Sequence, residues 1–459
     1  MNAPRPEHAA AAPRSEGAAA PCSDLAAVAR RSDPAADAPR AGCEPMSDQR
    51  VAEVLAEGRM PARAALTRGR AALALALLLG LQPITTDVFL PALPSLTRTL
   101  GASLEQAQLT MSALILAFGF AQLAWGPVAD RVGRRRVLLV GLAVYTLASL
   151  GATLADSIQT LVAWRVLQGA TLAAAVVCAR ALVRDLYDPV EGAQVMSLGL
   201  SGLAVIALLG PSLGGVATML AGWRSALGLV SAAGAATFAW VVWRLPETAP
   251  VLNPRATAPG PLLSQWRFIA RDRAFVAWTA LISATYGGLF VILAGSSYVY
   301  IGTLGLTPLA YGVAIGSTSA AYMAGTFVCR RWVARLGVAR AVRRAGWFTF
   351  AGGASIVVFA AAGASTVWAV LLPQWLFTFA HGVHQPCGQT GAVGPFPKAA
   401  GAAAALAGFV LAGTAFLIGL WLGRALDGTT WPFALGVGAC ALATTTIAWT
   451  LVQRLPPTH

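Results

Sequence analysis

Long runs without a charged residue constrain this chain more than any other feature. Six such runs beyond residue 190 each exceed the 18 residues that suggest a membrane-spanning helix; they cover 192–223, 225–243, 274–329, 345–397, 399–423 and 428–453. Of the 459 residues, 57% are hydrophobic and 11% are charged, whereas soluble domains carry about 25% charged residues. A water-soluble fold cannot bury so much apolar surface, so we expect an integral membrane protein.

The apolar runs and the residues that interrupt them predict twelve membrane helices. Twelve spans of about 20 residues use roughly 240 of the positions after Arg70 and leave connections of ordinary length. The runs lack the period-two alternation of a transmembrane barrel. We therefore predict an all-α fold with spans near 71–97, 104–126, 137–155, 158–182, 192–218, 223–244, 274–300, 309–330, 345–363, 366–391, 399–424 and 430–453.

The distribution of arginine predicts how the chain is oriented in the membrane. Every second connection is rich in arginine, and Lys and Arg near span ends stay on the cytoplasmic side, so we expect both termini inside the cell. The connections expected inside contain Arg131, Arg134, Arg135, Arg136, Arg255, Arg267, Arg271, Arg273, Arg330, Arg331, Arg335, Arg340, Arg343 and Arg344, against Arg98, Arg224 and Arg424 outside. The net charge of +14 therefore reflects topology and does not indicate nucleic-acid binding.

Residues 1–70 differ in composition from the rest of the chain. They are rich in Ala, Pro, Arg and Ser and contain no apolar run long enough for a signal peptide. We predict a disordered cytoplasmic tail. Because Met46 and Met60 both precede the first span, translation could start at Met1 or at either of them, and the bundle would be retained.

The spans divide into two predicted six-helix halves, 71–245 and 273–455, joined by a cytoplasmic linker at 246–272 that is rich in Pro and charge. The sequence after the second span, GPVADRVGRRR at 126–136, has a weaker echo after the eighth, RRWVARLG at 330–337. Repeats of this kind are common in transporters. We therefore expect the halves to be pseudo-symmetric.

Two ionisable residues interrupt the predicted spans. Asp87 lies in the first, and a charged, unpaired carboxylate in hydrocarbon costs several kcal/mol; we favour a proton carrier that faces a cavity, over a permanently paired ion or a residue kept wet near the surface. Arg165, in the fourth span, is followed by Gln168 and Gly169. Its guanidinium group either interacts with Asp87 or an anionic substrate, or it donates hydrogen bonds to carbonyl groups of a neighbouring helix. The sequence does not decide between these roles.

The fifth and tenth spans each contain an unusual cluster. Gly210-Pro211-Ser212-Leu213-Gly214-Gly215 combines a helix breaker with residues that permit close packing, and it lacks the strand-turn-helix context of a serine hydrolase. The tenth span contains three residues whose side chains can ligate a metal, and they are spaced three positions apart: His381, His384 and Cys387. Because Pro386 interrupts them, we favour a partly unwound polar segment over a metal site, and we predict no metal.

The remaining residues argue against ATP hydrolysis and disulfides. The single lysine, Lys398, follows Pro397, so no P-loop can exist and any uphill transport must use an ion gradient. The six cysteines show no C-x-x-C pair. We expect no cofactor and no enzyme activity, since the spans lack paired carboxylates.

These motifs together resemble the major facilitator superfamily, and within it the Bcr/CflA group of drug:proton antiporters. The resemblance covers about 71–455 and is most specific at Thr86–Pro94 and at His384–Gln389 with Gly394–Pro397. It implies a conformational latch at Gly126, Asp130, Arg131, Gly133 and Arg134, an arginine motif at Arg165, Gln168 and Gly169, and an antiporter motif at Gly210, Pro211, Gly214 and Gly215.

The chain departs from the group at two positions. Ile206 stands where a further glycine is common, and Lys398 where an acidic residue is frequent.

The resemblance also implies how the protein works. Two six-helix halves rock around a central cavity, and Asp87 and Arg165 couple a proton to drug efflux. The Ala-rich composition and the use of Arg in place of Lys indicate a GC-rich bacterial genome, so we expect a monomer among the lipids of the bacterial inner membrane. Its partners are then a small-molecule substrate and protons. We expect the cavity to be lined by Gln82, Gln168, Tyr286, Phe290, Trp375, His384 and Gln385. Alternatives are a proton-coupled transporter of an amino acid or other metabolite, and a transport-dead receptor or scaffold.

Overall fold

The computed structural model describes residues 66–249 and 252–455. The predicted tail, with Met1, Met46 and Met60, lies outside them apart from its last five residues. The helices of the first half are α2 (Arg68–Asp87), η1 (Leu90–Ala92), α3 (Leu93–Thr99), α4 (Leu104–Val132), α5 (Arg134–Thr153), α6 (Ile158–Leu186), α7 (Pro189–Ala221) and α8 (Trp223–Arg244). After α9 (Pro259–Ala270) come α10 (Arg273–Ser297), η2 (Tyr298–Thr303), α11 (Pro308–Leu336), α12 (Val338–Ala361), α13 (Val367–Val393), η3 (Pro397–Ala399), α14 (Ala400–Ala425), α15 (Trp431–Trp449) and η4 (Val452–Arg454).

Local sequence signals explain where these helices begin and end. Ser103 and Gln106 form a reciprocal capping box at the start of α4. Gly133 and Gly337, which occupy the same place in the sequence echo, adopt φ values of +107° and +79°. Glycine tolerates this region without steric cost, so both copies of the echo form the same kind of tight helix-to-helix turn.

The predicted all-helical membrane fold is confirmed. Within the described residues, eleven segments are long and apolar enough to cross a membrane. α13 is the other long helix; its 27 residues include two histidines and two prolines, and it packs against α10, α11 and α12. The long helices match the predicted spans to within several residues, and the largest difference at a helix start is at α12, which begins at Val338 where the prediction is 345.

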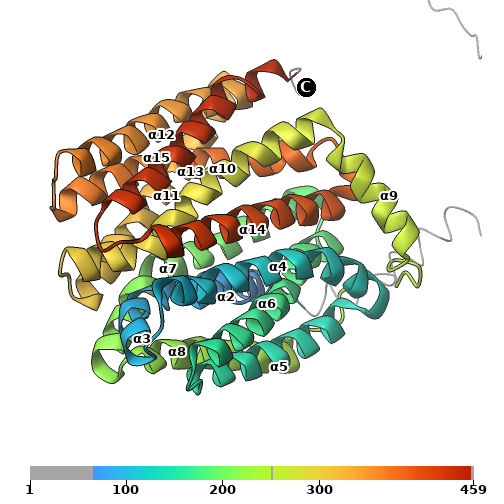
Figure 1. The fold of residues 1–459 in the computed structure, drawn as a ribbon. Coiled ribbons are helices and arrows are strands. Elements are labelled where there is room, and N and C mark those ends of the chain that lie inside the picture. The colour runs from blue at the N-terminus through green and yellow to red at the C-terminus, as the bar shows by residue number, and fades with distance from the viewer. Residues whose placement is uncertain (1–65, 250–251, 456–459) are drawn as a thin grey trace, which may run out of the picture. The chain divides into compact units, whose positions relative to one another are not determined.

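The helices form two groups (Figure 1). α2–α8, blue to green, pack mainly on one another, as do α10–α15, yellow to red. The first and second halves meet where α4 packs against α14 and where α7 packs against α11.

In the part of the chain that the structure describes, three of the four polar contacts between the halves lie toward one end of the bundle, and the fourth, between Ser319 and Ala207, lies near the middle of α11 and α7. The four are Thr97 to Tyr298 at 3.0 Å, Gln108 to the Ala294 carbonyl at 2.7 Å, Arg424 to Glu105 at 2.8 Å and Ser319 to the Ala207 carbonyl at 3.3 Å. We call this the joined end and the other, which carries the linker, the linker end. The halves are therefore tied together away from the linker.

The linker contains structure that the sequence analysis did not predict. The Asn253 amide donates to the Asp130 carbonyl at 2.9 Å, and Arg131 donates to the Thr257 hydroxyl at 2.8 Å. α9 follows and packs against α14 and α10. The linker is thus bonded to the first half and packed on the second.

Candidate functional site

A break in the first span positions Asp87. α2 ends at this residue, and the chain resumes as a short 3-10 helix before α3. Pro91 and Pro94 lack the N–H groups that would bond the carbonyls of Asp87 and Leu90 four residues earlier, which accounts for the break. The Asp87 side chain is partly exposed, and its carboxylate accepts a hydrogen bond of 2.7 Å from Thr86.

Arg165 supports this break. Its side chain is fully buried, and it donates to the carbonyls of Thr85 on α2 and Thr110 on α4, each at 3.2 Å, and to the Gln168 side chain at 2.8 Å. The guanidinium carbon lies 4.3 Å from the ring centre of Phe89. The final carbonyls of a helix have no partner within it, so Arg165 stabilises the broken end of α2. In the described residues it forms no ion pair with Asp87.

The glycines of α7 make room for the break. A Cβ atom at Gly210 would lie 3.6 Å from that of Asp87, and one at Gly214 would overlap the carbonyl oxygen of Val88. Gly215 instead faces the second half, where a Cβ would lie 2.5 Å from the Pro308 carbonyl oxygen. α7 remains a continuous helix through Pro211. One motif therefore contacts both the Asp87 segment and α11.

The second half contributes aromatic groups to the same place. The short helix η1, which follows Asp87, packs against α10 and α11, the helices that carry Tyr286 and Tyr311. Tyr311 also shares a hydrogen bond of 2.9 Å with Ser296. The other carboxylates on described membrane helices lie near helix ends, at Glu105, Asp130, Asp185 and Glu191. Asp87 is therefore the deep carboxylate beside the contact between the two halves.

Two of the predicted latch residues, Asp130 and Arg134, belong to an ion cluster at the linker end. The Arg134 side chain bonds to Asp130 and, at 3.1 Å, to Asp185. Glu247 accepts hydrogen bonds from the backbone N–H groups of Arg134 at 2.8 Å and Arg135 at 3.2 Å. Sequence reasoning missed Asp185 and Glu247, since each is distant in the chain and a common residue type at a helix end. Gly126 lies within α4 beside Val177.

The predicted cavity residues differ in their exposure in this structure. Gln168, Phe290 and His384 are fully buried, because Gln168 bonds to Arg165 and Ser149 inside the first half, Phe290 packs near Gly419, and His384 bonds to Thr349 inside the second half. Four others are partly exposed and remain candidates: Gln82, Tyr286, Trp375 and Gln385.

The expected unwinding in the tenth span is wrong. α13 is a continuous helix through Pro373 and Pro386, and it packs along its length against α10, α11 and α12. Its ring nitrogens face different helices: His381 Nδ1 lies 3.1 Å from the Thr285 hydroxyl and His384 Nε2 lies 3.0 Å from that of Thr349. Within the described residues no three His, Cys, Asp or Glu side chains converge as a metal site.

Comparisons with known proteins agree with this architecture. The sequence profile of the Major Facilitator Superfamily matches residues 75–413. Multidrug resistance protein D of Escherichia coli is 30% identical, over 73% of this chain and 84% of its own length. A bicyclomycin resistance protein homolog of Haemophilus influenzae is 26% identical, over 83% of this chain and 96% of its own.

A solved structure shares the fold. It is a bacterial homolog of the human lysosomal transporter Spinster in an inward-facing, occupied conformation, which superimposes with a TM-score of 0.65 at 14% identity over 84% of this chain and 95% of that one. The matches confirm the resemblance seen in the sequence and indicate a multi-pass transporter of the bacterial inner membrane that acts on small molecules and is not an enzyme. The chain belongs to the major facilitator superfamily.

Proposed function

We propose that this protein exports drugs or other small amphipathic molecules in exchange for protons. A proton that enters from outside neutralises Asp87, and a substrate from the cytoplasm or inner leaflet competes for the deprotonated state. The two halves then exchange access. One charge that moves through 100 mV supplies about 2.3 kcal/mol, enough for roughly fifty-fold accumulation.

The position of Asp87 carries this proposal. It lies at a helix break that Arg165 and the α7 glycines support, and the helix segment that follows it packs against α10 and α11 of the opposite half. An ionisable group within a membrane, without an ionic partner in the described residues, marks an ion or substrate path. We assign the proton-carrying role to Asp87 and a positioning role to Arg165.

The contacts between the halves support a direction for the movement. The linker end holds the arginine-rich connections, and such connections remain cytoplasmic, so both termini lie inside and the joined end faces outward. The observed state is then closed to the outside. Export requires the joined contacts to break, while the cluster of Arg134 with Asp130 and Asp185 holds α4, α5 and α6 of the first half together at the cytoplasmic end. We expect a monomer to perform this cycle.

Proton release from acidified vesicles tests the proposal. The purified chain is reconstituted, a pH-sensitive dye reports the gradient, and compounds that include bicyclomycin, phenicols and cationic dyes are added. We expect at least one to discharge the gradient with the parent and with Asp156→Asn, whose side chain is 96% exposed, but not with Asp87→Asn. Thermal unfolding of each variant verifies folding.

Two outcomes would contradict the proposal. Equal discharge by the parent and by Asp87→Asn would remove the proton role of Asp87. A folded parent that responds to none of these compounds would refute drug efflux and favour a metabolite substrate or a scaffold role.

A further inference from the structure

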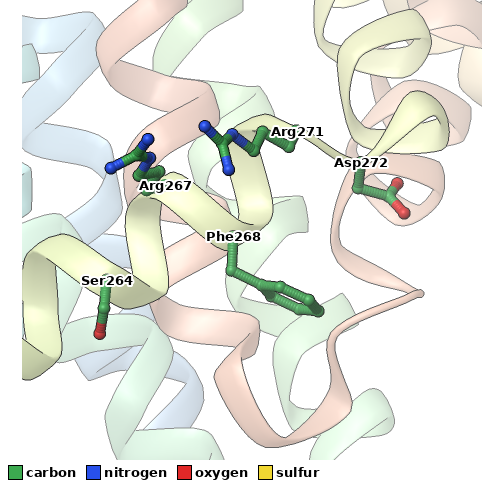
Figure 2. A pocket seen from close by; sticks show the side chains of 5 residues that line it. All are labelled: Ser264, Arg267, Phe268, Arg271 and Asp272. Atoms are coloured by element: carbon green, nitrogen blue, oxygen red, sulfur yellow. The ribbon is translucent and has the colours of Figure 1, made fainter.

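α9 has two faces of different character. The face toward the bundle contains Leu262 and Trp266, which are partly buried, and Ile269, which is fully buried. Residues at helical spacing on the other face line a hollow together with Asp272 at the start of α10; they are Ser264, Arg267, Phe268 and Arg271. Figure 2 shows the side chains of Arg267 and Arg271 on the same side of α9.

One carboxylate, that of Asp272, lines the same hollow as the two arginines. In the described residues neither guanidinium group forms an ion pair. The nearby carboxylate of Asp272 is engaged as the cap of α10, where it accepts the N–H of Phe275 at 2.8 Å. Like charges four residues apart on a helix repel one another. An anion at the hollow would remove that repulsion.

Apolar side chains surround these charges. Leu263 and Phe268 are 67% and 70% exposed, so apolar surface lies beside the two arginines. Phe268 also packs edge-on against Phe396, with ring centres 6.1 Å apart. α9 lies at the linker end, where the helices leave the membrane. A surface that combines free guanidinium groups with exposed apolar residues matches the headgroup and upper acyl region of a lipid.

We propose that α9 binds an anionic phospholipid of the adjacent leaflet. Arg267 and Arg271 hold the phosphate group, because the planar guanidinium fork suits phosphate oxygens. Leu263 and Phe268 contact the acyl chains. The lipid thereby fixes α9 against the corner between α13 and α14, where Phe396 lies. The leaflet is the cytoplasmic one if the orientation proposed above is correct; the binding itself does not depend on that orientation or on transport.

Site-specific quenching in vesicles tests this proposal. A bimane fluorophore is attached to Ala270→Cys in the full chain with its six native cysteines replaced. Two vesicle preparations have the same content of phosphatidylcholine and phosphatidylglycerol. In one the nitroxide quencher is attached to phosphatidylcholine, and in the other it is attached to phosphatidylglycerol. Each arginine near an anionic leaflet favours anionic lipid roughly fivefold. We therefore expect labelled phosphatidylglycerol to quench more strongly, and high salt to reduce the preference.

Matched variants decide the outcome. Arg267→Gln/Arg271→Gln should abolish the preference, whereas Arg340→Gln/Arg344→Gln, which removes two exposed arginines at the same spacing on α12, should retain it. Unchanged elution and thermal unfolding verify that each variant is folded. Equal quenching by both lipids in the parent, a preference that survives in the α9 variant, or an equal loss in both variants would overturn the proposal.

Discussion

Replacing Gly215 with alanine should open the joined end. Gly215 lies on α7 at the contact with α11, and a Cβ there would lie 2.5 Å from the Pro308 carbonyl oxygen and 2.9 Å from the Leu309 Cα atom. Both are backbone atoms, so no side-chain rotation can relieve the overlap. Ordinary contact begins at 3.4 Å, and the two helices must therefore separate by about 0.9 Å.

This overlap raises the free energy only of the state in which the joined end is closed. Overpacking a tight contact typically costs about 1–3 kcal/mol. When the joined end opens, α7 and α11 move apart and the overlap disappears. The closed-to-open ratio should therefore fall by roughly 5- to 150-fold. Gly312→Ala, whose Cβ would lie 2.5 Å from the Pro211 carbonyl oxygen across the same contact, should act in the same direction.

Cysteine labelling measures the shift. Ser297, fully buried on α10, is replaced by cysteine in a chain without native cysteines. A membrane-impermeant maleimide is then added to intact cells. Since labelling requires opening, we expect its rate to rise with the open fraction in Gly215→Ala.

A glycine outside the contact provides the control. A Cβ at Gly413 on α14 would meet no atom within 4 Å, so Gly413→Ala should label like the parent. Equal labelling rates in folded Gly215→Ala and Gly413→Ala would refute the argument that this contact sets the conformational balance.

Three further outcomes follow from the contacts described. Arg165→Lys should lower transport in vesicles by at least roughly tenfold, because one ammonium group cannot replace the bonds to two helices; a normal rate would contradict this. Glu247→Ala should destabilise the start of α5 by about 0.5–2 kcal/mol, seen as a lower midpoint of thermal unfolding, whereas Glu105→Ala should change it less. The sulfurs of Cys329 and Cys387 lie 3.6 Å apart. Diamide should accept one hydrogen atom from each thiol, so that a disulfide forms and the intact mass falls by the mass of two hydrogen atoms. The mass of the Cys387→Ser variant should not change.

The architecture follows from sequence for a direct physical reason. In hydrocarbon the backbone must satisfy its own hydrogen bonds, so long charge-free runs become helices. The same argument predicts that Asp87 lies within a span, regardless of which side chains pack around it. The sequence analysis did not predict that the helix is interrupted after Asp87, where the structure shows a short 3-10 segment.

The rotation and partners of each helix depended on tertiary structure. Arg165 had two open interpretations, and packing placed its guanidinium group on the carbonyls of α2 and α4. Gln168, Phe290 and His384 turned inward, since long-range contacts decide which face of a helix meets a cavity. Cys329 and Cys387 are 58 residues apart, and no local signal predicts that they meet. Side-chain partners across helices are set by the sum of many weak contacts, which a single sequence does not display.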